Sequence, residues 1–107
     1  MKITINIYYT GEGDNALQFV REMEKSKIAD MIRMEKGNLK YEYFLPMDES
    51  GTVLLIDSWE SQEALDKHHA SPMMKKIAAL REKYDLHMRV EKYTEIENGD
   101  DIRFIRK

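Results

Sequence analysis

The 107-residue sequence has no cysteine, only two prolines and a single tryptophan. Without cysteine it can form no disulfide, no thiolate metal site and no cysteine nucleophile. Charges of both signs are interspersed and the net charge is −3, so no basic patch exists to follow a phosphate backbone, and we expect no nucleic-acid partner. No apolar run approaches the roughly 20 residues that a membrane span needs, and the polar N-terminus is unlike a signal peptide. We expect one small cytoplasmic domain without a membrane partner.

The first part of the sequence predicts a strand followed by a helix. Residues 3–9 alternate between two kinds of side chain, which is the period-two pattern of a strand with two different faces. Asp14 follows a glycine-containing break and is the expected N-cap of a helix over residues 15–34. The apolar stripe of this helix weakens across residues 24–27, where we expect a kink.

Two further strands follow, with a turn between them. Residues 39–45 alternate and predict a second strand, and Pro46 opens the turn sequence that ends it. Residues 53–56 are continuously apolar, which predicts a third strand that is central in its sheet and covered on both faces.

The most informative stretch runs from Trp59 to Pro72. Trp59 closes the apolar third strand, Ser61 is a typical N-cap for a short helix, and the Ser71-Pro72 pair marks the start of another helix. The sequence therefore predicts a helix split in two. His68 comes just before the break, where its side chain can face a cleft instead of lying along a continuous helix surface.

The end of the chain predicts an amphipathic helix, a fourth strand over residues 86–96 and a turn at residues 98–101. Residues 102–105 alternate well enough for a short edge strand but are too few to pack alone. We divide the chain into a domain over residues 1–96 and a tail over residues 97–107. The tail is expected either to become ordered against a partner subunit or to be disordered.

The order of elements is β-α-β-β-α-β with the second helix split, which predicts an α+β, ferredoxin-like fold. Such a fold has an antiparallel sheet with helices on one face only. Because residues 53–56 are apolar on both faces of their strand, the bare face of the sheet needs a cover. A second copy of the chain, packed sheet against sheet, is the simplest cover, so we predict a homodimer.

Two motifs carry a resemblance to a known family: Glu35-x-Gly37-Asn38-x-x-Tyr41, and Trp59-Glu60-Ser61 followed by Ala64-Leu65-x-x-His68-x-x-Ser71-Pro72. With the order of elements, they resemble the antibiotic biosynthesis monooxygenase family up to about Ile96. The resemblance implies a dimeric α+β barrel. The family includes cofactor-independent oxygenases of polyaromatic phenols, quinol oxygenases, haem degraders and members without a known substrate.

The resemblance implies an activity and a set of site residues. We predict a cofactor-independent monooxygenase acting on a small quinol or phenol, with no metal and no cofactor. A base removes a phenolic proton, and the resulting anion donates an electron to oxygen; histidine suits this task because its ordinary pKa lies near neutral pH. Catalytic roles are predicted for His68 as the base and for Trp59 and Asn6 as hydrogen-bond donors to the oxyanion, and substrate contacts for Tyr8, Tyr41 and Met73.

The sequence departs from the family pattern at two positions, and other functions are compatible with it. Met73 occupies a position where many members have a second histidine, and Asp57 one where glutamate is common. His69 points about 100° away from His68 on a helix and is expected at the surface, and the helix after Pro72 lacks the histidine of the haem degraders. The alternatives are a non-catalytic ligand-binding or stress-associated dimer, and a pure dimerisation module.

Overall fold

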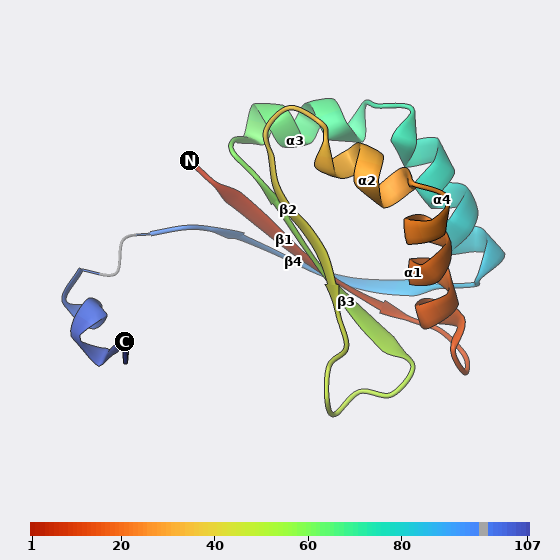
Figure 1. The fold of residues 1–107 in the computed structure, drawn as a ribbon, viewed down its shortest axis with the longest axis horizontal. Coiled ribbons are helices and arrows are strands. Elements are labelled where there is room, and N and C mark those ends of the chain that lie inside the picture. Colours follow the sequence, from red (N-terminus) through yellow and green to blue (C-terminus); the bar gives the residue numbers. More distant parts are fainter. Residues whose placement is uncertain (97–98) are drawn as a thin grey trace.

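The computed structural model describes residues 1–96 and 99–107 and contains a four-stranded antiparallel sheet with helices on one face (Figure 1). The strand order is β2-β3-β1-β4. The elements are β1 (Ile3–Thr10), α1 (Asn15–Lys25), α2 (Ile28–Arg33), β2 (Asn38–Phe44), β3 (Thr52–Trp59), α3 (Gln62–His69), α4 (Met73–Lys83), β4 (His87–Thr94) and a C-terminal 3₁₀ helix (Gly99–Phe104). This is the predicted α+β, ferredoxin-like fold with a split second helix.

The alternation of each strand decides what its two faces contact. In β1 the buried side chains are Ile3, Ile5, Ile7 and Tyr9, which share the helix-covered face. In β3, Val53, Leu55, Asp57 and Trp59 occupy that face, since Asp57 pairs with Ile5 and Leu55 with Ile7 across the two strands. The core of the domain therefore lies between the sheet and the helices, and β3 is a central strand as predicted.

The face of the sheet that carries no helices is more polar than expected. The apolar run at residues 53–56 had predicted an apolar face. Leu54 and Ile56 point to this face and are half-buried. Beside them, the hydroxyls of Thr4 and Ser58 lie 2.9 Å apart in a hydrogen bond. Further along, the guanidinium of Arg89 stacks over the Tyr8 ring at 4.0 Å. The face is thus a mixture of aliphatic, aromatic and hydrogen-bonding groups.

The predicted helix over residues 15–34 is wrong in one respect, because it is two helices. Lys27 has a φ angle of 70°, in the left-handed region, and this residue separates α1 from α2. The break falls inside the stretch where the apolar stripe weakens. It lets both short helices bury their own apolar sides, with Phe19 and Met23 from α1 and Ile32 from α2 fully inside the core.

The C-terminal segment also differs from the prediction. β4 ends at Thr94 rather than Ile96, and residues 99–104 form a 3₁₀ helix instead of an edge strand. A 3₁₀ helix satisfies its backbone locally, here with the Ile105 amide donating to the Ile102 carbonyl at 3.1 Å, and needs no neighbouring strand. Residues 99–107 lie apart from the domain in Figure 1. Of the predicted turn at 98–101, Asn98 lies outside the described residues.

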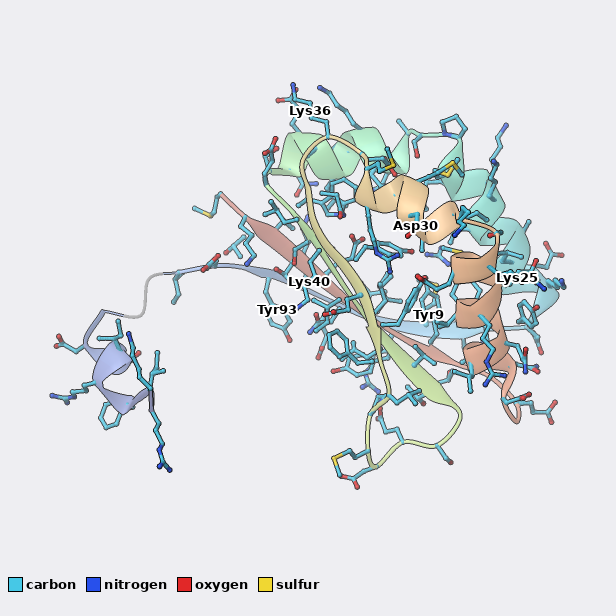
Figure 2. All side chains as sticks on the ribbon, in the orientation of Figure 1. Tyr9, Lys25, Asp30, Lys36, Lys40 and Tyr93 are labelled. Carbon is cyan, nitrogen blue, oxygen red and sulfur yellow. The ribbon has the colours of Figure 1, made fainter. Side chains whose placement is uncertain are left out.

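Figure 2 shows that Lys25 and Lys36 project outward from the domain, whereas Tyr9 points into the layer between sheet and helices. Among the helices of the described residues, none is long and apolar enough to cross a membrane.

Candidate active site

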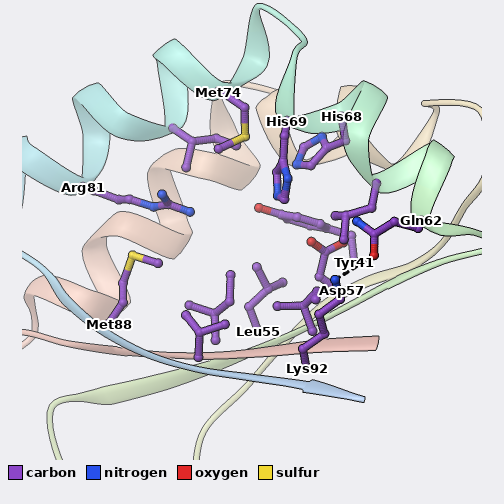
Figure 3. Close-up of a pocket in the computed structure, with 15 residues that line it drawn as sticks. Tyr41, Leu55, Asp57, Gln62, His68, His69, Met74, Arg81, Met88 and Lys92 are labelled. Atoms are coloured by element: carbon purple, nitrogen blue, oxygen red, sulfur yellow. Dashed lines mark hydrogen bonds between the residues drawn. The ribbon is translucent and has the colours of Figure 1, made fainter. Parts of the chain in front are cut away.

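A cavity of about 310 Å³ lies between the sheet and helices α3 and α4 (Figure 3). Its size suits a small organic molecule. Much of the wall is aliphatic, formed by Ile5, Ile7, Leu55, Leu65, Ile77 and Val90. Polar side chains also reach it from several elements, namely Tyr41, Asp57, Gln62, His68, His69, Arg81 and Lys92. The cavity therefore combines an apolar interior with a few polar groups at defined places.

His68 is the central polar group of the cavity wall. It is only 4% exposed, and its ring stacks on that of Trp59 with the centroids 4.7 Å apart. Its Nδ1 atom lies 2.9 and 3.2 Å from the two carboxylate oxygens of Glu35. A carboxylate accepts a hydrogen bond, so Nδ1 carries the proton in the neutral ring, and Nε2 then holds the basic lone pair. Within the described residues both hydrogen bonds of the ring use Nδ1, and His68 lines the cavity, so Nε2 is available to a ligand.

The backbone at Gly37 explains how Glu35 reaches a histidine 33 residues away. Gly37 has a φ angle of +88°, and a Cβ atom there would lie 2.6 Å from the Cβ of Ala64 on α3. Its carbonyl accepts a hydrogen bond from the Glu60 amide at 2.8 Å. This close approach holds the turn before β2 against α3, and Glu35 leads into that turn. The Glu35-x-Gly37 motif therefore has a structural role, because it holds the turn before β2 against α3, the helix that carries His68.

The Gly37→Ala variant is expected to be destabilised by about 2 kcal/mol or more, since alanine meets both an unfavourable φ angle and a steric overlap with Ala64. Urea unfolding followed by circular dichroism measures this loss. The matched control is Gly13→Ala, because Gly13 also has a positive φ, +53°, but an added Cβ there would have no atom within 4 Å. Equal losses in the two variants would contradict the close-packing argument.

Asp57 is a buried carboxyl group on the sheet side of the cavity. It is 5% exposed, and its Oδ1 atom has no hydrogen-bond partner among the described residues. Burial raises the pKa of Asp57 from 3.8 to about 7; the nearby indole N–H of Trp59 opposes the rise, and the negative charge of Glu35 adds to it. The indole is close enough to lower the pKa of the carboxyl group, although the distance and angle between Trp59 Nε1 and its neighbours do not meet those of a hydrogen bond. Asp57 is thus able to change its protonation state near neutral pH.

Two buried tyrosines complete the polar surroundings. The Tyr9 hydroxyl accepts hydrogen bonds from Nε and Nη2 of Arg81 at 3.2 and 2.9 Å. Burial raises the pKa of Tyr9, and Arg81 partly opposes this rise. The pKa of Tyr41 is raised well above its usual value, first by burial and then by Tyr43, whose hydroxyl donates to that of Tyr41 at 3.4 Å. Both tyrosines therefore stay protonated near neutral pH and act as hydrogen-bonding groups, not as bases.

The structure brings together only some of the residues predicted from the sequence. His68 and Tyr41 line the cavity. Trp59 is fully buried behind His68 and supports its ring without forming part of the wall. Met73 is half-buried, and its neighbour Met74 lines the cavity in its place.

The prediction that Asn6 and Tyr8 share a ligand with His68 is contradicted by the geometry. Both residues alternate with the buried isoleucines of β1 and therefore point to the opposite face of the sheet. The side chains that β1 directs into the cavity are Ile5 and Ile7. The apolar face of the strand turns toward the helices because these bury it, and the polar face is left outside.

Two smaller expectations about the helices also change. His69 is exposed as predicted, yet it lines the same cavity as His68, with the ring centroids 5.8 Å apart. Ser61 caps α3 as expected, with its hydroxyl accepting from the Ala64 amide at 3.1 Å. Ser71 makes no such cap, since its hydroxyl is buried without a partner among the described residues.

Within residues 1–96 and 99–107, no group of three or more histidine or acidic side chains is arranged to hold a metal ion.

Asp57 and Arg81 are site residues that the sequence patterns did not single out as such. Each had a detectable signal. Asp57 is the one charged residue in the strand that ends at Trp59, on the same face as Trp59 by period two. Arg81 lies four residues after Ile77, and so on the apolar face of α4.

The fold is similar to several solved structures. A proposed antibiotic biosynthesis monooxygenase from Deinococcus radiodurans superposes with a TM-score of 0.76 at 19% identity, covering 91% of this chain and 94% of that one. A second proposed monooxygenase of this kind, from Caulobacter crescentus CB15, gives a TM-score of 0.78 at 18% identity, over 90% and 91% of the two chains. SnoaB, a cofactor-independent oxygenase from Streptomyces nogalater, gives 0.72 at 17% identity, over 90% and 94%.

At these identities the structural matches show a shared fold. No curated protein sequence matches the chain. The sequence model of one family, antibiotic biosynthesis monooxygenase, matches residues 2–80, which include Glu35, Asp57, Trp59 and His68. This chain belongs to the antibiotic biosynthesis monooxygenase family.

Proposed function

We propose that the protein is a homodimeric, cofactor-independent monooxygenase that oxidises a small quinol or phenol in the cavity beneath α3 and α4. The observation that carries this proposal is the pair formed by buried His68 and half-buried Glu35, which places an oriented histidine in the wall of a cavity of about 310 Å³. SnoaB is a cofactor-independent oxygenase, and its chemistry is of the class proposed here.

The pair is suited to removing a phenolic proton. Glu35 accepts the Nδ1 hydrogen, orients the ring and stabilises the imidazolium that forms when Nε2 takes a proton. The stacked Trp59 fixes the ring plane. The resulting aryl anion is electron-rich and reacts with dioxygen in a pocket whose aliphatic walls limit the access of water. A quinol that supplies four electrons takes up one oxygen atom and releases the other as water, so the product is a hydroxyquinone.

Oxygen uptake by the purified protein tests this proposal directly. With a panel of quinols and phenols, and a chelator present, we expect substrate-dependent oxygen consumption above the rate of autoxidation. With ¹⁸O₂, one labelled atom should appear in the product and one in water. Binding of a quinol without any uptake would contradict the oxygenase proposal and favour the ligand-binding alternative. The pure dimerisation module is disfavoured by the cavity itself, since Met73 and the tyrosines do not fill it.

The dimer is proposed to form through the face of the sheet that carries no helices. Leu54 and Ile56 on this face are only half-buried, and tyrosines and hydrogen-bonding groups surround them. We also propose that the tail contacts the partner subunit, because Phe104 is 75% exposed on its 3₁₀ helix.

A lysine placed on this face is expected to break the dimer. The wild-type protein should sediment as a dimer at micromolar concentration, and Ile56→Lys as a monomer, because the dimer would bury an unpaired charge. Ala78→Lys, which adds the same charge on an exposed position of α4, is the control and should remain dimeric. A wild-type monomer would overturn the proposed assembly.

A further inference from the structure

Two buried polar atoms at the end of β3 approach each other without forming a hydrogen bond of good geometry. These are Oδ1 of Asp57 and Nε1 of Trp59, both buried without a hydrogen-bond partner among the described residues. Nearly all buried polar groups in native proteins are paired with protein or water, so such atoms call for an explanation. The other unpaired atoms of this kind, on Asn6 and Ser71, belong to residues outside the cavity wall, whereas Asp57 lines it.

A structural ion pair does not account for Asp57. The titratable and charged groups around it come from every element packed there: Tyr9, Glu35, Tyr41, His68, His69, Arg81 and Lys92. The nearest candidates to neutralise it are engaged elsewhere. Arg81 donates to Tyr9, Lys92 donates to Gln62 at 2.7 Å, and His68 is held by Glu35. Glu35 has the same charge as Asp57 and opposes its ionisation.

The charged groups that line the cavity restrict which kind of ligand group can form a hydrogen bond to Asp57. Arg81 and Lys92 line the same space and disfavour a cationic ligand, while Asp57 disfavours an anionic one. A neutral hydroxyl donates one hydrogen bond and fits both conditions. The aliphatic walls between the polar groups suit a ring that carries it.

Asp57 and His68 lie within the span of one small ligand. Asp57 and Trp59 are two residues apart on one face of β3, so their Cα atoms are about 7 Å apart, and His68 stacks on Trp59. In Figure 3 the histidines approach the cavity from α3 and Asp57 from the sheet.

We propose that Asp57 accepts a hydrogen bond from a second hydroxyl group of the ligand, so that the cavity selects an aromatic diol over a phenol with a single hydroxyl. This inference rests on the proposed function, in which the first hydroxyl meets His68. Asp57 is then a specificity-determining residue, because it lines the cavity and its Oδ1 atom has no hydrogen-bond partner among the described residues.

Anaerobic binding tests this without requiring turnover. The single tryptophan, stacked on His68, reports binding by its fluorescence. The probes are naphthalene-1,4-diol and 4-methoxy-1-naphthol, which differ by one methylated hydroxyl. At about pH 8, where the Asp57 carboxyl is ionised, wild-type protein should bind the diol about 10- to 100-fold more tightly, the scale for a hydrogen bond to a charged group. Asp57→Leu keeps the branched shape of the side chain but has no hydrogen-bonding atom, and it should bring the two affinities within about twofold by weakening binding of the diol.

The outcomes separate this inference from the proposed function. Equal binding of both probes by the wild type, or selectivity that survives Asp57→Leu, would overturn the role of Asp57 and leave the oxygenase proposal standing. Failure of both probes to bind would overturn the two together. If Asp57→Leu does not fold, Asp57→Asn takes its place, and it should lower the preference for the diol because a neutral amide accepts a weaker hydrogen bond.

Discussion

Replacing His68 with glutamine is expected to lower kcat/KM for a quinol by about 100-fold or more, the usual scale for loss of a general base. Glutamine fills much of the same space and can still donate to Glu35, but it has no basic nitrogen to take a phenolic proton. Alanine is a less informative change, since His68 is 4% exposed and stacked on Trp59, and its removal would leave a hole in the core. Oxygen uptake under saturating and limiting quinol measures the effect.

The control is His87→Gln, which makes the same change at an exposed histidine in β4. It should retain wild-type turnover. Unfolding by urea establishes that His68→Gln is folded at the assay temperature. A folded His68→Gln protein with unchanged kcat/KM would remove His68 from the mechanism, and Asp57 would then be the remaining candidate for the base.

Asp57→Asn is expected to stabilise the protein at pH 8 by up to about 4 kcal/mol and to change its stability little at pH 4. The pKa of Asp57 is raised from 3.8 to about 7, so between these values the folded state binds a proton that the unfolded state has lost. Stability therefore falls as pH rises through this window. Below it both states are protonated, and above about pH 7 the full penalty of the buried carboxylate is present, at about 1.36 kcal/mol for each pKa unit.

Asparagine resembles the protonated carboxyl in shape and cannot ionise, so the variant should lack this pH dependence. Urea unfolding at about pH 4, 6 and 8 measures the difference in unfolding free energy between variant and wild type. Asp66→Asn, on the exposed surface of α3, is the control and should differ little from wild type at each pH. A stabilisation by Asp57→Asn that is the same at both ends of this range would show that burial does not raise this pKa.

These two predictions concern two groups that line the same cavity, His68 and Asp57. His68 has a partner that holds it ready for a proton, whereas Asp57 Oδ1 has none among the described residues, and the carboxyl makes the folded state less stable when it ionises. Polar groups that lower stability are found at functional sites, where the requirement of the chemistry outweighs that of the fold. Binding of an aromatic diol to Asp57 would offset part of this loss, so ligand should stabilise the wild type more than Asp57→Leu.

The sequence by itself determined the features that depend on local periodicity and local hydrogen bonding. Alternation predicted the strands, the apolar run predicted the central place of β3, and Ser61 predicted the start of α3. The break before Met73 placed His68 beside the cavity. These signals are readable because each involves residues within one turn or one strand of each other.

Only the tertiary structure decided which side chains meet. Glu35 and His68 are 33 residues apart, and Tyr9 and Arg81 are 72 apart. Alternation shows that Asn6 and Ile5 face opposite ways but leaves open which face borders a ligand. The packing of the helices decides which face borders the cavity. They cover the apolar face of β1, because burying apolar surface there lowers the free energy of the folded state the most. Asn6 therefore points away from the cavity, while Asp57, on the covered face of β3, is carried inside it with Trp59.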